Sequence, residues 1–123
     1  MTAKKILLVE DDSDFRTALG IRFRAAGYLP VFAADGATAV TTAQRERPDL
    51  IVLDLGLPGG DGLVVLERLR RIPRLAAIPV MVLTARDPLE VEQQALRLGA
   101  SVFLQKPVDS EVFLEAVREA LGP

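Results

Sequence analysis

The sequence predicts an α/β fold: a doubly wound, five-stranded parallel sheet flanked by five helices. Five short apolar runs recur along the chain, segments with helical spacing separate them, and 123 residues suit a single domain spanning 1–123. The runs cover residues 6–9, 29–34, 50–53, 80–83 and 102–104. Strict alternation favours parallel strands, because parallel neighbours need crossovers that a helix supplies.

The apolar runs have the composition of buried strands. They are rich in Val, Ile and Leu, and apart from the alanine-rich second run they do not alternate with polar residues. This pattern is typical of strands that are buried on both faces of a parallel sheet. We therefore expect helices on both faces.

The intervening segments have the spacing and the end signals of helices. The first has a helical spacing of Phe15, Leu19, Phe23 and Ala26, between a cap at Asp12 or Ser13 and a terminating Gly27. The second is expected at residues 37–47, opened by Asp35 and Gly36, and the others at 62–72, 88–98 and 110–121. Together with the runs, they complete five strand-helix units.

Composition excludes several classes of function. Lys and Arg number 15 against 17 for Asp and Glu, so no strong field favours direct binding to nucleic acid or to an anionic membrane. The absence of Cys and His excludes thiolate and imidazole catalysis and ordinary zinc sites. No apolar run approaches the ~20 residues that span a bilayer. We expect a soluble, cytoplasmic protein that uses oxygen ligands.

Polar residues follow four of the runs. Glu10 and Asp11 follow the first, Asp54 the third, Thr84 the fourth and Lys106 lies just after the fifth. In doubly wound sheets ligands bind at the carboxyl ends of the strands, so these side chains should meet at one edge. Carboxylates brought together repel unless a cation lies between them, and oxygen-only ligation suits Mg²⁺.

This arrangement indicates phosphoryl transfer to a carboxylate. Asp54 is the candidate nucleophile, because a carboxylate can form an aspartyl phosphate when positioning and charge neutralisation supply the catalysis. The metal would be held by Asp54, Asp11 and Glu10, while Lys106 and Thr84 would contact phosphoryl oxygens. Taken singly, each residue has an ordinary structural interpretation. Their joint placement favours the chemical one.

These residues resemble a CheY-like response-regulator receiver domain of two-component signalling. The matching segments are LLVEDD at residues 7–12, DLGLPGGDG at 54–62, LTA at 83–85 and KP at 106–107. The resemblance covers the whole chain, and the order and spacing of the motifs together are specific. It implies a flavodoxin-like sheet of order 2-1-3-4-5. It also implies that the backbone carbonyl of Gly56 completes the metal shell.

The resemblance further implies partners and a switch. The phosphoryl donor would be a phosphohistidine of a sensor histidine kinase or histidine phosphotransfer protein. The Lys106–Pro107 peptide would be cis. Phosphorylation would draw Thr84 toward the phosphate and turn Phe103 inward, remodelling the surface of the fourth helix, last strand and fifth helix. Such a domain catalyses its own phosphorylation and dephosphorylation but is a signalling domain, not an enzyme.

Two features depart from the family pattern. Phe103 stands where many relatives carry tyrosine, so an inward state lacks a hydroxyl and must be held by packing. Gly56, Gly59 and Gly60 make the loop after Asp54 rich in glycine, which enlarges its conformational freedom. Gly56 and Arg86 occupy positions associated in the family with the lifetime of the phosphoryl group, which the sequence does not predict.

Three alternatives stay open at this point. A pseudo-receiver would keep the fold as a protein-binding module without phosphorylation. A hydrolase of the haloacid-dehalogenase type expects an acid where Gly56 stands, and a flavodoxin expects a phosphate-binding turn where this chain is acidic. The sequence also does not choose between a stand-alone receiver and a domain of a hybrid kinase or larger regulator. The cognate kinase, signal, output and any phosphorylation-linked homodimer stay equally open.

Overall fold

A computed structural model of the chain describes residues 2–58 and 62–123, so the loop residues Gly59, Gly60 and Asp61 lie outside the described part. The strands are β1 (Lys5–Val9), β2 (Leu29–Ala33), β3 (Leu50–Leu53), β4 (Val80–Thr84) and β5 (Val102–Gln105). The helices are α1 (Ser13–Ala25), α2 (Gly36–Glu46), α3 (Gly62–Arg71), α4 (Pro88–Arg97) and α5 (Ser110–Leu121).

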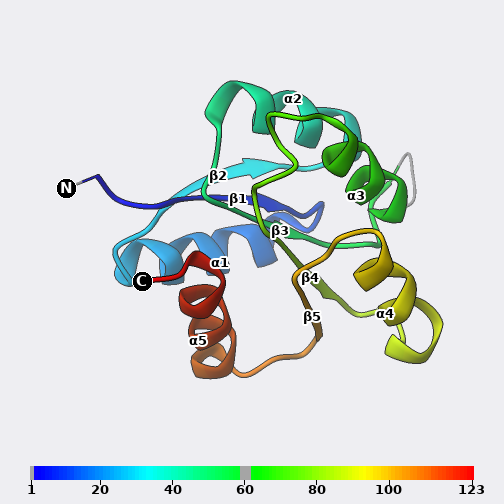
Figure 1. The fold of residues 1–123 in the computed structure, drawn as a ribbon. Helices are drawn as coiled ribbons and strands as arrows, with labels where there is room; N and C mark the ends of the chain where they lie inside the picture. Colours follow the sequence, from blue (N-terminus) through cyan, green and yellow to red (C-terminus); the bar gives the residue numbers. More distant parts are fainter. Residues whose placement is uncertain (1, 59–61) are drawn as a thin grey trace.

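The strands form one sheet in the order β2-β1-β3-β4-β5, and every neighbouring pair is parallel. Helices cover both faces of this sheet (Figure 1). The predicted fold class is therefore confirmed, including the strand order that the resemblance implied. None of the helices in the described ranges has the length and apolar character needed to cross a bilayer.

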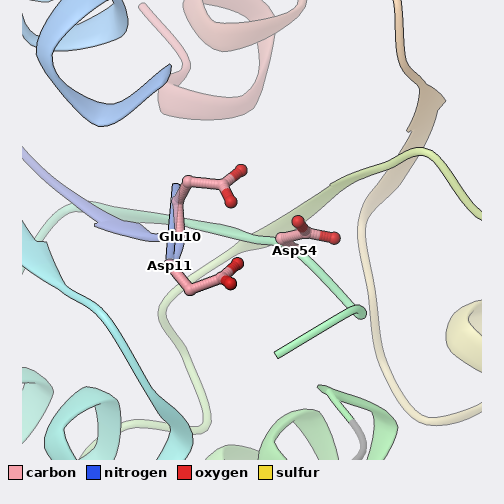
Figure 2. Close-up of side chains that lie close together, drawn as sticks. All are labelled: Glu10, Asp11 and Asp54. Carbon is pink, nitrogen blue, oxygen red and sulfur yellow. The ribbon is translucent and has the colours of Figure 1, made fainter. Parts of the chain in front are cut away.

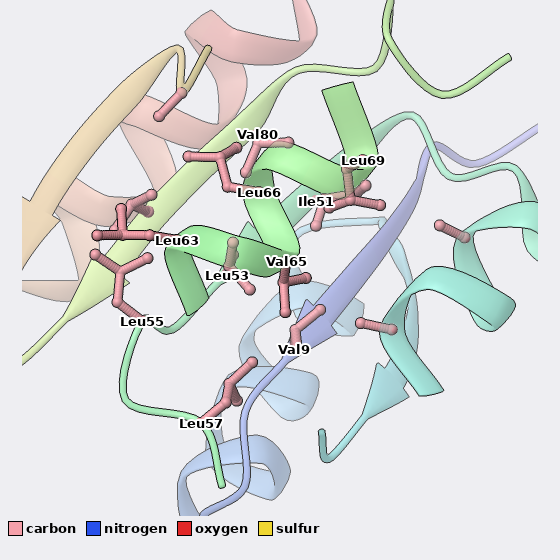
Figure 3. Close-up of a cluster of buried hydrophobic side chains, with 14 of the residues drawn as sticks. Val9, Ile51, Leu53, Leu55, Leu57, Leu63, Val65, Leu66, Leu69 and Val80 are labelled. Atoms are coloured by element: carbon pink, nitrogen blue, oxygen red, sulfur yellow. The ribbon is translucent and has the colours of Figure 1, made fainter. Parts of the chain in front are cut away.

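Successive residues of β1 pack into different cores because side chains alternate across a strand. Leu7 and Val9 belong to a cluster shared with α2, α3 and α4, which Figure 3 shows around Leu66. Ile6 and Leu8 belong to a second cluster shared with α1 and α5. Strands β1, β3 and β4 are consequently almost wholly buried, as predicted.

The last strand differs from the expectation of burial on both faces. Residues of β5 are only partly buried, and Gln105 is exposed, because this strand lies at the edge of the sheet. The second run also ends one residue early, at Ala33, and Ala26 is exposed as the C-cap of α1. Ala26, which the helical spacing grouped with Phe15, Leu19 and Phe23, therefore lies just outside the helix.

Helix starts follow the predicted caps. The Asp12 side chain accepts hydrogen bonds from the backbone N–H groups of Asp14 and Phe15, at 3.0 and 3.1 Å. Asp35 accepts one from the N–H of Thr38 at 2.8 Å. Such bonds satisfy amide groups that the first turn of a helix leaves unpaired. Asp12 thus fixes the turn that directly follows the acidic pair.

Candidate functional site

Three predicted ligands meet at the carboxyl edge of the sheet. Glu10 and Asp11 follow β1, and Asp54 follows the neighbouring strand β3 (Figure 2). The register pairs Val9 with Leu53, and the Asp54 N–H donates to the Val9 carbonyl at 3.1 Å. One carboxylate oxygen from each acid lies within 4.8 Å of the others. Strand pairing therefore brings together acids that are far apart in the sequence.

Lys106 joins these acids from beyond β5. Its Nζ lies 2.5 Å from Glu10 Oε1 and 3.2 Å from Asp54 Oδ2. Glu10 is 2% exposed and Asp54 is 9% exposed, whereas Asp11 faces solvent. The ammonium neutralises only one of the three carboxylate charges, so the pocket is negative.

Burial and the excess of negative charge shift the pKa values of Glu10 and Lys106. Burial raises the pKa of Glu10, and the nearby charge of Asp54 adds to the rise against the opposing hydrogen bond from Lys106. For Lys106, burial by itself lowers the pKa, but the contacts with Glu10 and Asp54 together outweigh burial and raise it. Lys106 consequently stays protonated near neutral pH, and ionisation of Glu10 is less favourable in the folded protein than in water.

A divalent metal ion fits this set of donors. Mg²⁺ prefers hard oxygen ligands, an open side where water can complete its coordination, and uncompensated negative charge. The pocket offers all three, because Asp11 is exposed and leaves one side open to water. Glu10, Asp11 and Asp54 could hold it. The Gly56 N–H donates to Asp54 Oδ1 at 3.0 Å, so this residue lies beside the same carboxylate.

Thr84 lies at the end of β4, on the same edge of the sheet. It is almost completely buried and pairs with Gln105, and its carbonyl accepts a hydrogen bond from the Lys106 N–H at 2.8 Å. Its Oγ1 accepts a weaker bond from the Arg86 N–H at 3.3 Å. Thr84 is thus linked to Lys106 through the backbone.

Phe103 lies outside the acidic pocket. Its ring is partly buried and packs against the core cluster shared with α2, α3 and α4. The Lys106–Pro107 peptide is cis, the isomer that the resemblance implies. The structure therefore gathers Glu10, Asp11, Asp54 and Lys106, with Thr84 on the adjoining strand and Phe103 in the apolar layer.

Sequence reasoning missed two side chains at the site, both in the first turn of α1. Arg16 Nη1 donates to the backbone carbonyls of Glu10 and Asp11, at 2.8 and 3.2 Å. The Lys106 Nζ lies over the Phe15 ring, 4.1 Å from its centroid. Helical spacing placed Phe15 on an apolar face, but no local signal pairs it with Lys106.

Gly62 has a further role that the sequence did not reveal. It begins α3, as the expected helix 62–72 predicts, and an added Cβ there would lie 2.4 Å from the Leu55 Cα and 2.9 Å from the Asp54 carbonyl oxygen. Its N–H donates to the Leu55 carbonyl at 3.0 Å. The absence of a side chain lets α3 pack directly against the backbone that presents Asp54.

The sheet order and the acidic edge define a CheY-like flavodoxin fold. The family model described as response regulator receiver domain matches residues 6–118. The chain therefore belongs to the response regulator receiver domain family of two-component systems.

Relatives in this family differ in length. The chain is 36% identical over 121 residues to sporulation initiation phosphotransferase F of Bacillus subtilis, covering 98% of this chain and 96% of that protein. It is 41% identical over 117 residues, 95% of its length, to the DNA-binding dual master transcriptional regulator RpaA of Synechocystis, but spans only 48% of that regulator. It also spans about half of the transcriptional activator IrlR of Burkholderia pseudomallei.

One solved structure bears on the acidic pocket. The receiver domain of sensor histidine kinase PA1611 from Pseudomonas aeruginosa has a magnesium ion coordinated in its active site cleft. It aligns with a TM-score of 0.89 and 30% identity, covering 99% of this chain and all of that one. A similar fold of similar length thus exists with metal in its cleft.

Proposed function

We propose that this receiver domain accepts a phosphoryl group on Asp54 from a phosphohistidine of a sensor histidine kinase or histidine phosphotransfer protein. The observation that supports this most is the convergence of Glu10, Asp11 and Asp54 within 4.8 Å, with the Lys106 ammonium against two of them. Buried, partly compensated charges of this kind cluster at functional sites.

Glu10, Asp11 and Asp54 would hold Mg²⁺, with the Gly56 carbonyl as a further ligand. When bound, the ion supplies positive charge that offsets the pocket acids and the phosphoryl oxygens. The chain's own residues fix the acceptor. The Gly56 N–H holds Asp54 Oδ1, and the Lys106 ammonium lies 3.2 Å from Oδ2. The carboxylate is therefore oriented before the donor arrives.

In the transfer, an Asp54 carboxylate oxygen attacks the phosphorus atom of the phosphohistidine. An O–P bond forms as the P–N bond breaks, and the electron pair of that bond stays on the imidazole nitrogen of the donor. The nucleophile is a carboxylate oxygen with its own lone pair, so the step needs no general base on this chain. Lys106 and the Thr84 hydroxyl would then donate to phosphoryl oxygens and stabilise their charge.

Thr84 and Phe103 would convert this modification into a surface change. A hydroxyl drawn toward the phosphoryl group vacates space beside β5, which an inward-turning Phe103 would fill. Because Phe103 has no hydroxyl, packing alone would hold this inward state. The surface of α4, β5 and α5 would differ between the two forms and would signal to the output partner.

Incubation with acetyl phosphate and Mg²⁺, followed by intact mass measurement, tests the proposal. The parent protein should gain the mass of one phosphoryl group, and Asp54→Asn should gain none. Asp49→Asn is a matched control, because Asp49 lies at the opposite end of β3 and should leave the gain intact. No gain in the parent would overturn the proposal and favour a phosphorylation-independent binding module.

A further inference from the structure

The Lys106 ammonium is enclosed on three sides. Glu10 Oε1 and Asp54 Oδ2 lie 2.5 and 3.2 Å from Nζ, and the face of the Phe15 ring lies 4.1 Å away, measured to its centroid. Two of these contacts are with the acids of the pocket. The third is with a neutral ring on a different element of the fold.

A lysine side chain needs such support if its ammonium is to have one position. Its stem has four methylene groups, and Lys106 follows an exposed edge-strand residue, Gln105. An aromatic face attracts a cation and keeps water from the covered side, which strengthens the electrostatic attraction of the acids on the other sides. The Phe15 contact therefore opposes departure of the ammonium toward solvent.

The ring is positioned by contacts with groups other than the pocket acids. The Phe15 N–H is bound at 3.1 Å by Asp12, the cap of α1, and the ring packs against the core cluster that contains Phe23 and Phe113. Helix capping and core packing thus decide where the ring lies. It would remain there when the charges in the pocket change on phosphorylation.

We propose that Phe15 is a positioning residue for Lys106: its ring holds the ammonium at the acceptor carboxylate, ready to bind a phosphoryl oxygen. The role rests on the proposed function of Asp54. The competing interpretation is that Phe15 only fills space at the edge of the core. The two interpretations differ in whether an aromatic face is required or any apolar side chain suffices.

Two substitutions separate these interpretations. Phe15→Leu keeps an apolar side chain and removes the aromatic face, whereas Phe15→Tyr keeps the face. We expect phosphorylation by acetyl phosphate to slow about threefold to tenfold in Phe15→Leu and to stay near the parent rate in Phe15→Tyr. Equal rates in all three proteins, with the parent phosphorylated, would overturn the proposal.

NMR of the parent protein gives a second test that does not depend on phosphorylation. The chain has three lysines, so the Lys106 side-chain methylene signals can be compared with those of Lys4 and Lys5. The aromatic face should shift the Lys106 signals upfield, and the shift should disappear in Phe15→Leu and persist in Phe15→Tyr. Lys106 signals that match those of Lys4 and Lys5 in the parent would overturn the proposal. A shifted lysine in a parent that takes up no phosphoryl group would overturn the proposed function and leave the contact standing.

Discussion

The two ends of the sheet place a lysine in very different surroundings. At the amino end, Lys5 Nζ lies 3.1 Å from Glu46 Oε1, and the two side chains are 28% and 29% exposed. At the carboxyl end, Lys106 Nζ lies 2.5 Å from Glu10 Oε1, with side chains 18% and 2% exposed. Both are lysine–glutamate pairs, and they differ in the water available to each partner.

This difference shows where the fold bears an electrostatic cost. Water reaches both partners at the amino end more freely, so the formation and the loss of that pair matter less. At the carboxyl end, burial weakens hydration, and the acids near Lys106 outnumber it. An imbalance that is unfavourable for the metal-free fold makes the same edge receptive to a cation.

Removing each lysine in turn should reveal the largest difference between the two ends of the sheet. We expect Lys106→Ala to lower the free energy of unfolding by about 3 kcal/mol without Mg²⁺, because Glu10 and Asp54 lose their shared partner. Lys5→Ala is the matched control and should have a smaller effect, because Glu46 has more contact with water than Glu10. Urea unfolding of both variants measures the difference. Equal losses would show that the two ends are electrostatically alike.

A steric change tests the same edge without altering charge. Gly62→Ala should destabilise the protein by about 1–3 kcal/mol and slow phosphorylation, because the new Cβ would push against the backbone of Leu55 and Asp54. Gly56→Ala is the control, since its Cβ would lie an ordinary 3.7 Å from Asp54 Oδ1. Thermal unfolding and phosphorylation rates check both. Better tolerance of Gly62→Ala than of Gly56→Ala would contradict the packing argument.

Mg²⁺ should stabilise the folded protein by binding at the carboxyl end of the sheet, and the size of this effect should depend on pH. At a concentration of about ten times its Kd, a ligand that binds only the folded state adds about 1.4 kcal/mol to the free energy of unfolding. The pKa of Glu10 is raised from 4.5, so ionising Glu10 costs the metal-free protein stability as pH rises. Mg²⁺ needs the ionised form, so its stabilisation should be full near neutral pH and fall as pH drops through that raised pKa.

Thermal unfolding with and without Mg²⁺ across this range measures the effect. In Glu10→Gln the Mg²⁺-induced shift should be smaller at neutral pH. In Glu46→Gln, at the amino end, it should match that of the parent. A shift in the parent that does not change with pH would refute the assignment of Glu10 as a ligand.

Arg16→Ala should have the smallest effect. Arg16 binds the carbonyls of Glu10 and Asp11, which water can reach after the substitution, so we expect a loss of about 1 kcal/mol. Mg²⁺ affinity, measured by calorimetry, should also fall, because the turn that presents the acids loosens. Arg24→Ala removes an exposed cation from the same helix and should leave Mg²⁺ affinity unchanged. Identical affinities in the two variants would exclude a positioning role.

Much of the fold could be predicted because the signals are local. The uninterrupted apolar run of β3 indicated a buried strand, and Asp12 and Asp35 were predicted at the starts of α1 and α2, where they act as caps. The errors concern positions whose burial depends on which elements pack beside them. Strand β5 was expected to be buried on both faces, but its position at the sheet edge leaves it partly exposed.

The residues of the candidate site also fall into those that the sequence indicated and those that it did not. Residues at strand ends could be chosen from the sequence, because the carboxyl ends of parallel strands share one edge. Phe15 and Arg16 could not be chosen, because their contacts with Lys106 and with the acidic backbone depend on where α1 packs. The roles of Thr84 and Phe103 stay predictions.

Local sequence signals were enough to predict the alternation of strands and helices and the polar residues at the strand ends, because periodicity and end signals act within a few residues. Long-range packing, in contrast, sets which strands are neighbours and which side of Lys106 is covered by Phe15. It also decided that Gly62 packs on the backbone of Leu55. Such contacts join distant segments, and no local pattern encodes the distance between them.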